Sequence, residues 1–320
     1  MKILVTGAAG FIGSHVCEYY TRLGDHVVGI DNFDNFYPER IKLLNISDLK
    51  NNAQFQFHKA DIRDRDSLKK IFASNRIDTV IHLAAKAGVR PSIESITDYY
   101  EVNVNGTVAL LEEMKANNVK KMVFASSSSV YGNNQKVPFS ESDPVDNPIS
   151  PYASTKKSGE LLNHVYSHLY GFDITCLRFF TVYGPRQRPD LAIHKFTRLI
   201  DEGHPIPFYG DGTTARDYTY IDDIVSGISC ALNNLHGFRI FNLGESQVIT
   251  LDMLVKTIEK CLGKKAVLNQ LPLQQGDVKI TYADISKAKA EIGYDPKYTF
   301  EEGVNKFVGW YLQSKDLLNS

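Results

Sequence analysis

The sequence predicts a doubly wound α/β fold, in which one parallel sheet is followed by a smaller C-terminal domain. Short apolar runs of strand length alternate with longer segments of helical spacing, and a glycine-rich turn follows the first run. Strands that alternate with helices pair in parallel through right-handed crossovers, which places helices on both faces of the sheet. With 320 residues, 43% of them hydrophobic, the chain is long enough to bury a core of this kind.

The predicted strands are the apolar runs of the first 180 residues. They are Ile3–Val5, His26–Ile30, Phe55–His58, Thr79–Leu83, Lys121–Ala125 and Ile174–Phe179. Helical spacing of apolar residues occurs between them, at Ile12–Leu23, Leu68–Phe72, Val102–Met114 and Ser154–Leu169. We therefore expect this part of the chain to form the sheet and the helices that cover it.

The rest of the chain is less regular. After Phe180, Pro- and Gly-rich loops separate helical patterns at Asp222–Leu235 and Leu251–Leu262. We predict that residues 1–180, with a return segment at about 213–243, form the sheet domain, and that residues 181–212 and 244–320 form the smaller domain. No repeat or linker-like segment separates the two parts, so we expect them to pack as one body.

The composition argues against several classes of function. Thirty-six basic and 37 acidic residues give a net charge of −1, so bulk electrostatics favours neither nucleic acid nor an anionic membrane as a partner. The apolar stretches are too short for a membrane span or a signal peptide, and we expect a cytoplasmic protein. The four cysteines lack metal-ligand spacing, so we expect structural thiols and no bound metal: Cys17, Cys176, Cys230 and Cys261.

The glycine-rich turn after the first strand predicts a bound dinucleotide. Gly7, Gly10 and Gly13 are spaced as GxxGxxG and open a helix, where a pyrophosphate meets unpaired backbone amides. Asp31 ends the second strand, where a carboxylate accepts a hydrogen bond from a ribose 2′-hydroxyl and repels a 2′-phosphate. The turn, the strand and the acid together predict a Rossmann-like NAD site. A glycine-rich turn that binds nothing is the alternative.

Further NAD contacts are expected where other strands end. Asp61-Ile62 and Leu83-Ala84-Ala85 each follow an apolar run, so they lie at the carboxyl edge of the sheet where the cofactor runs. Asp61 is equally suited to capping a helix, and the two alanines to tight packing. The other predicted NAD contacts are Phe11, Ile12, Asn32, Lys86, Asn103, Tyr152, Lys156 and Phe180.

Tyr152 and Lys156 are the predicted catalytic pair. They are four residues apart on one face of a helix that starts after Pro151. A phenol with a pKa of about 10 is a poor base at neutral pH, but a neighbouring cation favours the phenolate and lowers that pKa. A Tyr-x-x-x-Lys pair is also common on solvated helices, and the dinucleotide turn upstream is what favours the catalytic interpretation here.

A run of four serines follows the strand that ends at Ala125. It lies at the same edge of the sheet, so at least one hydroxyl can bind a reacting substrate oxygen beside Tyr152. We favour Ser127 as this partner and Ser129 as the second choice. The remaining serines are suited to satisfying the turn.

Taken together, the glycine turn, Asp31, the serines before Val130-Tyr131-Gly132, and Tyr152 with Lys156 resemble the nucleotide-sugar branch of the extended short-chain dehydrogenases/reductases. The resemblance extends over nearly the whole chain. Dehydratases of that branch carry Asp-Glu just before the Val-Tyr-Gly, and sugar-acid decarboxylases carry Glu there, whereas this chain has Ser128 and Ser129. The resemblance therefore implies a 4-epimerase, in which C4 of the sugar is oxidised by bound NAD and then reduced from the opposite face.

Details of the resemblance point to UDP-glucuronate 4-epimerases, which interconvert UDP-glucuronate and UDP-galacturonate. Galactose epimerases usually have Asn at the position of Thr181 and Arg at that of Gln274, and the stretch Arg186–Ala192 also looks like the glucuronate enzymes. Gln275 departs from that family, which often has Pro there.

The chemistry of glucuronate gives two of these residues a purpose. Oxidation at C4 creates a β-keto acid, which loses carbon dioxide when its carboxylate bond stands perpendicular to the ketone plane. The resemblance implies that Thr181 and Arg188 hold the carboxylate out of that alignment through charge-assisted hydrogen bonds. The alternative for Arg188 is a surface arginine in a loop.

The resemblance also implies contacts with UDP and a homodimer. Arg216 is expected at the diphosphate, residues 207–209 beside uracil, and Asp277 at a ribose hydroxyl. The helices at Val102–Met114 and Ser154–Leu169 are expected to pair in a four-helix dimer, unless their apolar faces simply pack on the sheet. The full set of predicted UDP-sugar contacts is Arg90, Ser127, Ser128, Thr181, Arg188, Pro207, Phe208, Tyr209, Arg216, Gln274 and Asp277.

Other functions fit parts of this pattern. A 4-epimerase of UDP-glucose or UDP-N-acetylglucosamine would differ only in the sugar. A UDP-glucuronate decarboxylase would share the oxidation and lose the carboxylate. A non-catalytic NAD-sensing protein on the same fold would have no need of the proton-transfer set Ser127, Tyr152 and Lys156.

Overall fold

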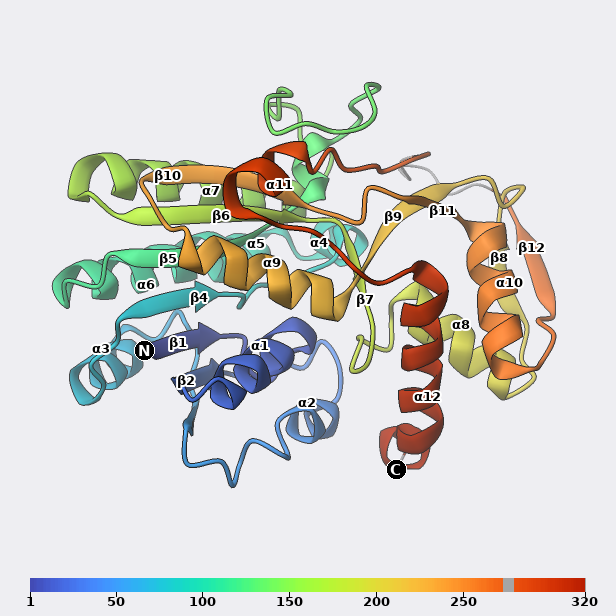
Figure 1. Cartoon of the computed structure of the whole chain (residues 1–320), viewed down its shortest axis with the longest axis horizontal. Helices are drawn as coiled ribbons and strands as arrows, with labels where there is room; N and C mark the ends of the chain where they lie inside the picture. Colours follow the sequence, from blue (N-terminus) through green and yellow to red (C-terminus); the bar gives the residue numbers. More distant parts are fainter. Residues whose placement is uncertain (273–278, 320) are drawn as a thin grey trace.

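The computed structural model describes residues 1–272 and 279–319, and its centre is a parallel sheet with helices on both faces (Figure 1). Within the described residues the sheet has seven strands in the order β10-β6-β5-β4-β1-β2-β3. This confirms the predicted doubly wound α/β fold. The strands are β1 (Lys2–Thr6), β2 (His26–Asp31), β3 (Phe55–Lys59), β4 (Thr79–His82), β5 (Lys121–Ser127), β6 (Asp173–Phe179) and β10 (Phe238–Leu243).

The order of the strands reverses next to β1. From β1 the chain runs outward through β2 and β3, and then returns to place β4 on the other side of β1. Ile3, Leu4 and Val5 are fully buried, because helices cover both faces of this central strand. The carboxyl ends of β1 and β4 therefore lie side by side, and ligands of doubly wound sheets bind at such a reversal point.

Two helical layers cover the sheet, and each has its own core. On one face lie α1 (Phe11–Arg22), α2 (Glu39–Asn45) and α9 (Ile221–Asn233), with α1 packed against α9. On the other lie α3 (Arg65–Ser74), α6 (Gly106–Ala116) and α7 (Pro151–Tyr170). Figure 1 shows α1 and α9 in front of the sheet and α6 and α7 behind it.

The predicted helix at Val102–Met114 is more complex than its periodicity suggests. Two short helices, α4 (Val89–Glu94) and α5 (Ile96–Tyr100), come first, and a π-helical turn at Glu101–Asn105 then leads into α6. This turn packs against α7.

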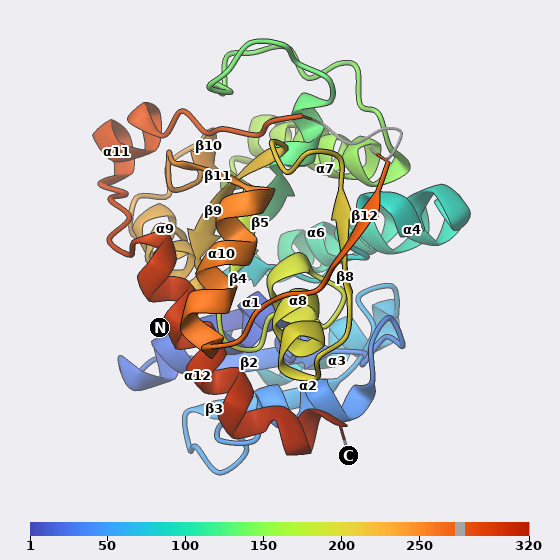
Figure 2. The ribbon, with the colours of Figure 1, turned by 90° about the vertical axis from the view of Figure 1, so that its right-hand side faces the viewer.

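The C-terminal part adds two small sheets at one end of the main sheet (Figure 2). β7 (Thr181–Tyr183), β9 (Ala215–Tyr220) and β11 (Val248–Thr250) form one, and β8 (Ile206–Tyr209) pairs with β12 (Leu268–Leu271) in the other. Of the helices α8 (Ala192–Asp201), α10 (Leu251–Leu262), α11 (Ser286–Ile292) and α12 (Phe300–Asn319), α10 packs on both α8 and α12. The core under α1 continues into this part without a break.

Two of the sequence expectations concern thiols and membranes. All four cysteines are free; Cys17 and Cys176 are buried, and Cys230 and Cys261 are half-buried. Among the helices of the described ranges, none combines the length and the apolar character that a membrane crossing requires. The proposed division into two domains stays a prediction, and β9, from the predicted return segment, lies outside the main sheet.

Candidate active site

A cavity of about 510 Å³ runs along the carboxyl edge of the sheet. It collects most of the predicted site residues, including the glycine turn and the loop after β7. Those that line it are Gly7, Gly10, Phe11, Ile12, Gly13, Asp31, Asn32, Asp61, Ile62, Leu83, Ala84, Ala85, Lys86, Ser127, Ser129, Tyr152, Lys156, Phe180, Thr181 and Arg188.

The glycine turn is shaped by close backbone contacts. Gly7 has φ +70°, and a Cβ there would lie 2.9 Å from the amide nitrogen of Ala84. A Cβ on Gly13 would lie 2.0 Å from the carbonyl oxygen of Gly7. Gly10 precedes α1 and offers no side chain to cap it. The N-terminal amides of this 12-residue helix thus open toward the cavity, an arrangement that fits a pyrophosphate.

Asp31 lies at the end of β2 with a fixed orientation. Its carboxylate accepts hydrogen bonds from the amides of Ala9 (3.2 Å) and Phe33 (2.8 Å), and the ammonium of Lys42 lies 3.8 Å away. Burial raises the pKa of Asp31, and Lys42 and the two amides oppose that rise. A carboxylate held in this way beside the glycine turn fits the predicted ribose contact.

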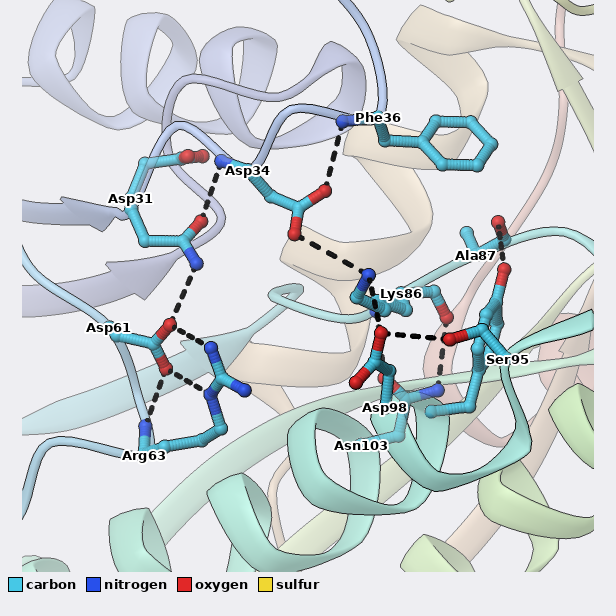
Figure 3. Close-up of polar contacts among 12 residues, drawn as sticks. Asp31, Asp34, Phe36, Asp61, Arg63, Lys86, Ala87, Ser95, Asp98 and Asn103 are labelled. Carbon is cyan, nitrogen blue, oxygen red and sulfur yellow. Dashed lines mark hydrogen bonds and ion pairs between the residues drawn. The ribbon is translucent and has the colours of Figure 1, made fainter. Parts of the chain in front are cut away.

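Asp61 belongs to the same end of the cavity and does not cap a helix (Figure 3). It accepts a hydrogen bond from the Asn32 side chain at 2.8 Å, and two from the Arg63 guanidinium. The bonds from Arg63 lower the pKa of Asp61 to about 2. The cap of α3 is Asp64, so the alternative of a capping role for Asp61 is wrong.

Lys86 links the segment after β2 to α5 beside the cavity, as Figure 3 shows. Its ammonium lies 3.7 Å from the carboxylates of both Asp34 and Asp98. The backbone of Lys86 is held by Asn103, whose side-chain amide accepts from its N–H (2.7 Å) and donates to its carbonyl (3.0 Å). Asn103 also donates to Thr155 of α7 at 2.9 Å. Asn103 therefore does not line the cavity; it ties the loop after β4 to α7.

Helix α7 places Tyr152 and Lys156 in the cavity. Ser150 caps the helix by accepting from the Ala153 amide at 3.1 Å, and Gly159 lets α7 approach β5, because a Cβ there would lie 2.4 Å from the ring of Phe124. The Lys156 ammonium is buried, donates to the Ala125 carbonyl at 2.7 Å and lies 6.0 Å from the centre of the Tyr152 ring.

The electrostatics of this pair differ from the prediction. Burial raises the pKa of Tyr152, and the groups that oppose the rise are the Ser127 hydroxyl and the charge of Arg188. Burial also lowers the pKa of Lys156 to about 8. The expectation that Lys156 lowers the pKa of the phenol is wrong for this structure, because loss of water outweighs the charge of an ammonium that is bound to Ala125 instead.

Of the four serines, Ser127 is the one that meets the phenol. Its hydroxyl lowers the pKa of Tyr152, and it donates to the Ser129 hydroxyl and accepts from the Ser129 amide, both at 3.2 Å. Ser126 donates to the buried carboxylate of Glu160 at 2.7 Å, and Ser128 does not line the cavity. The geometry therefore favours the first choice among the candidates, with Ser129 beside it.

Thr181 and Arg188, from β7 and the loop that follows it, also line the cavity. The Arg188 guanidinium binds Asp190 through Nε (3.0 Å) and Nη2 (2.8 Å), and its central carbon lies 4.8 Å from the centre of the Phe36 ring. Its side chain is only 16% exposed. Arg188 lies in a loop, as the alternative expects, but its side chain is largely covered.

Several predicted substrate residues lie away from the cavity. Residues 207–209 are in β8, where Phe208 is buried in the core and packs close to Gly212. Arg216, in β9, donates to the carbonyl of Ala215. Gln274 and Asp277 lie outside the described residues, as does Gln275. The predicted residues absent from the lining are Asn103, Arg90, Ser128, Pro207, Phe208, Tyr209 and Arg216.

Other residues line the cavity without having been predicted. Most are sequence neighbours of predicted residues, so the strand ends mark them indirectly. Phe36, Tyr37 and Lys42 come from the segment after β2, which carries no motif, and nothing in the sequence pattern identifies them. The full set is Ile30, Asp34, Phe36, Tyr37, Lys42, Ala60, Ala87, Gly88, Val89, Val102, Ala125, Ser126, Phe179, Val182 and Leu191. In residues 1–272 and 279–319 no cluster of three metal-ligating side chains occurs.

A family model described as GDP-mannose 4,6 dehydratase matches residues 4–307. The UDP-glucuronate 4-epimerase of Thermodesulfobacterium geofontis is 46% identical over 318 residues, which cover 99% of this chain and 98% of that protein.

Two solved structures are similar over nearly their whole length. UDP-glucuronic acid 4-epimerase from Bacillus cereus, in complex with UDP-glucuronic acid and NAD, has a TM-score of 0.92 and 41% identity and covers 98% of this chain and 99% of that one. UDP-glucose 4-epimerase from Thermotoga maritima, with UDP-glucose, has a TM-score of 0.89 and 34% identity, with coverage of 98% and 100%.

Proposed function

The chain belongs to the NAD-dependent nucleotide-sugar 4-epimerases of the extended short-chain dehydrogenase/reductase family, and from that premise we propose that it interconverts UDP-glucuronate and UDP-galacturonate. Relatives named for UDP-glucuronate and one named for UDP-glucose both share its fold, so the choice of sugar rests on the site. The observation that carries the proposal is that Thr181 and a largely buried Arg188 line the same cavity as Tyr152.

NAD is the cofactor that fits the part of the cavity formed by the glycine turn and Asp31. The Bacillus cereus relative is solved with NAD. In this chain neither Gly7 nor Gly13 has room for a Cβ, so the backbone of the turn can approach a pyrophosphate closely. Asp31 is held where it can accept from a ribose hydroxyl. When bound, NAD supplies a reversible acceptor for the hydride of C4.

We assign proton transfer to Tyr152, with Ser127 as its partner. Tyr152 must first lose its own proton; its phenolate then takes the proton of the 4-hydroxyl as C4 is oxidised, and the phenol so formed returns that proton to the 4-oxygen after the 4-keto sugar has rotated. The Ser127 hydroxyl lines the same cavity, lowers the pKa of Tyr152 and would bind the sugar oxygen beside the phenol. Lys156, anchored on the carbonyl of Ala125, keeps a cation beneath the site.

Arg188 gives the proposal its preference for an acidic sugar. Arg188 and Tyr152 line one cavity, and the charge of Arg188 lowers the pKa of the phenol. We therefore assign Arg188 to the carboxylate of a sugar that presents its C4 hydroxyl to Tyr152. Thr181 adds a hydroxyl from the start of β7. Holding the carboxylate in the plane of the 4-ketone keeps carbon dioxide from leaving during the oxidised stage.

We further propose that the protein is a homodimer that pairs through α7. Leu161, Val165 and Leu169 are spaced at four-residue intervals on this helix and are 56%, 44% and 60% exposed. Such an apolar stripe on a surface helix suits helix pairing. Sedimentation at micromolar concentration should give twice the mass of the chain, and Val165→Glu should give the monomer.

Product analysis tests the function. The purified protein, incubated with UDP-glucuronate and no added NAD, should form UDP-galacturonate and no carbon dioxide. UDP-glucose and UDP-N-acetylglucosamine serve as matched substrates, and faster epimerisation of either would reject the proposed sugar. Release of carbon dioxide with a UDP-pentose product would instead indicate a decarboxylase.

A further inference from the structure

The loop between β7 and α8, which carries Arg188, is fastened at three consecutive residues. We call Pro185, Arg186 and Gln187, with their partners His15, Glu18 and His194, the clasp. Its contacts join the helix that follows the glycine turn to the residue next to Arg188. None of these residues lines the cavity.

Two of the contacts come from α1. His15 donates from Nε2 to the carbonyl of Pro185 at 2.9 Å; the carbonyl only accepts, so Nε2 carries the proton. One turn further along, Glu18 accepts from the guanidinium of Arg186 at 2.5 Å, and both side chains are about five-sixths buried, with exposures of 15% and 16%. His15 and Glu18 are three residues apart and so lie on one face of α1.

The third residue of the loop is held from the opposite side. Gln187 is 1% exposed; its amide donates to the carbonyl of Val182 at 3.1 Å and accepts from the amide of His194 at 3.2 Å. The ring of His194 donates back to the carbonyl of Gln187 at 2.6 Å. Gln187 thus fixes the loop to the end of β7 and the start of α8.

The backbone at Arg186 shows that these contacts decide the conformation. Its φ is +66°, in the left-handed region that residues with a Cβ avoid. Such a conformation persists where surrounding contacts over-determine it. The clasp therefore fixes the orientation of the peptide that follows Arg186. In that orientation Gln187 is buried and Arg188 lines the cavity.

We propose that Glu18 and His15 are positioning residues for Arg188 and thereby set the preference for an acidic sugar. This inference rests on the proposed function of Arg188. Helix α1 begins at the glycine turn and carries His15 and Glu18 in its next turns, so one rigid element fixes both the pyrophosphate end and the carboxylate end of the cavity. The distance between the expected pyrophosphate site and the proposed carboxylate site is then set by α1.

Glu18→Gln tests the inference, because it keeps the size of the side chain and removes the charge that holds Arg186. We expect the ratio of Kd for UDP-glucose to Kd for UDP-glucuronate, measured by calorimetry on the NAD-loaded protein, to fall about tenfold. The share of UDP-glucuronate turnovers that end in carbon dioxide should rise. His15→Leu should act in the same direction, and His15→Gln, which keeps a donor near the Nε2 position, should restore the wild-type ratio.

Arg22→Gln is the matched control, because Arg22 is the solvent-exposed second partner of Glu18, at 3.1 Å, and is not part of the clasp. It should leave the ratio unchanged. A Glu18→Gln protein with a wild-type ratio, or with equal losses for both sugars, would overturn the inference and leave the proposed function standing. A wild-type protein that neither prefers nor turns over UDP-glucuronate would overturn both.

Discussion

We call the glycine turn with Asp31 the nucleotide end of the cavity, and Thr181 with Arg188 the substrate end. The turn is shaped by backbone contacts, whereas the substrate end consists of side chains held by distant parts of the chain. At the glycine turn, a Cβ on Gly13 would lie 2.0 Å from the Gly7 carbonyl oxygen, six positions earlier. At the substrate end, Arg188 packs on Phe36, and the loop behind it binds His15 from 170 positions away. The first site depends on local conformation, whereas the second depends on the whole fold.

This difference teaches where specificity for the sugar can change. A backbone cradle tolerates almost no substitution, because each added atom meets the main chain. The substrate end consists of exchangeable side chains held by a few long-range contacts. Relatives named for different UDP-sugars share one fold at TM-scores of 0.92 and 0.89, as expected if the sugar is selected at the second end.

Tyr152→Phe removes the proposed proton-transfer group and should cause the largest loss of activity. Without the phenol oxygen there is no proton acceptor for the 4-hydroxyl, so kcat should fall by about a thousandfold. The NAD content after purification should stay that of the wild type. Tyr170→Phe, in the last turn of the same helix, should be fully active. A Tyr152→Phe protein with near wild-type kcat would refute the assignment.

Gly13→Ala changes only the glycine turn at the nucleotide end of the cavity. The new methyl group would force α1 away from Gly7, so NAD affinity should fall by about a hundredfold or more, which is about 3 kcal/mol. Gly309→Ala in α12, where an added Cβ meets nothing within 4 Å, provides the control. Titration of each protein with NAD measures the effect; unchanged affinity would mean that the turn does not hold the dinucleotide.

Lys156 lies between the two ends, and its burial should appear in the pH dependence of stability. Its pKa is lowered from 10.5 to about 8, so between these values the unfolded chain binds more protons and the folded state gains stability as pH rises. Lys156→Met removes the cost of burying the charged form, which is fully present below pH 8 and amounts to about 3 kcal/mol or less.

The free energies of unfolding of Lys156→Met and wild type should therefore converge as the pH is raised from about 8 to 10.5. Urea unfolding at several pH values measures this, with exposed Lys120→Met as the reference protein. Loss of the hydrogen bond to Ala125 shifts the free energy of unfolding of Lys156→Met by the same amount at every pH, so it does not change how that free energy depends on pH. Parallel curves for Lys156→Met and wild type would show that the ammonium is solvated.

Arg188→Ala changes only the substrate end of the cavity and should have the smallest effect on catalysis. We expect kcat/KM for UDP-glucuronate to fall about tenfold, and more of the sugar to lose carbon dioxide, while NAD affinity stays constant. Arg198→Ala, on the exposed face of α8, is the control. If Arg188→Ala and wild type convert UDP-glucuronate alike, the carboxylate is held elsewhere.

The same contrast explains what could be predicted from the sequence. The glycine turn, Asp31 and the Tyr152–Lys156 spacing arise from local backbone geometry, which leaves a pattern in neighbouring residues. The role of Asn103 and the lining by Phe36 and Tyr37 arise from contacts between distant segments, which leave no such pattern. The resemblance supplied Thr181 and Arg188, because composition and spacing alone do not mark them.

The pKa of Tyr152 was predicted in the wrong direction for a related reason. The spacing of Tyr152 and Lys156 indicates that they share a helix face, but it carries no information on how deeply the phenol is buried. Burial dominates here, and the Lys156 ammonium is bound to the carbonyl of Ala125. The charge that reaches the phenol is that of Arg188, 36 positions later in the chain.

A crystal structure with NAD and UDP-glucuronate bound tests most directly whether the two ends hold one substrate. The Tyr152 hydroxyl should lie within hydrogen-bonding distance of the sugar 4-oxygen, next to the nicotinamide ring, with the carboxylate on Thr181 and Arg188. A complex in which the phenol lies far from nicotinamide, or in which the carboxylate faces bulk water, would contradict the account.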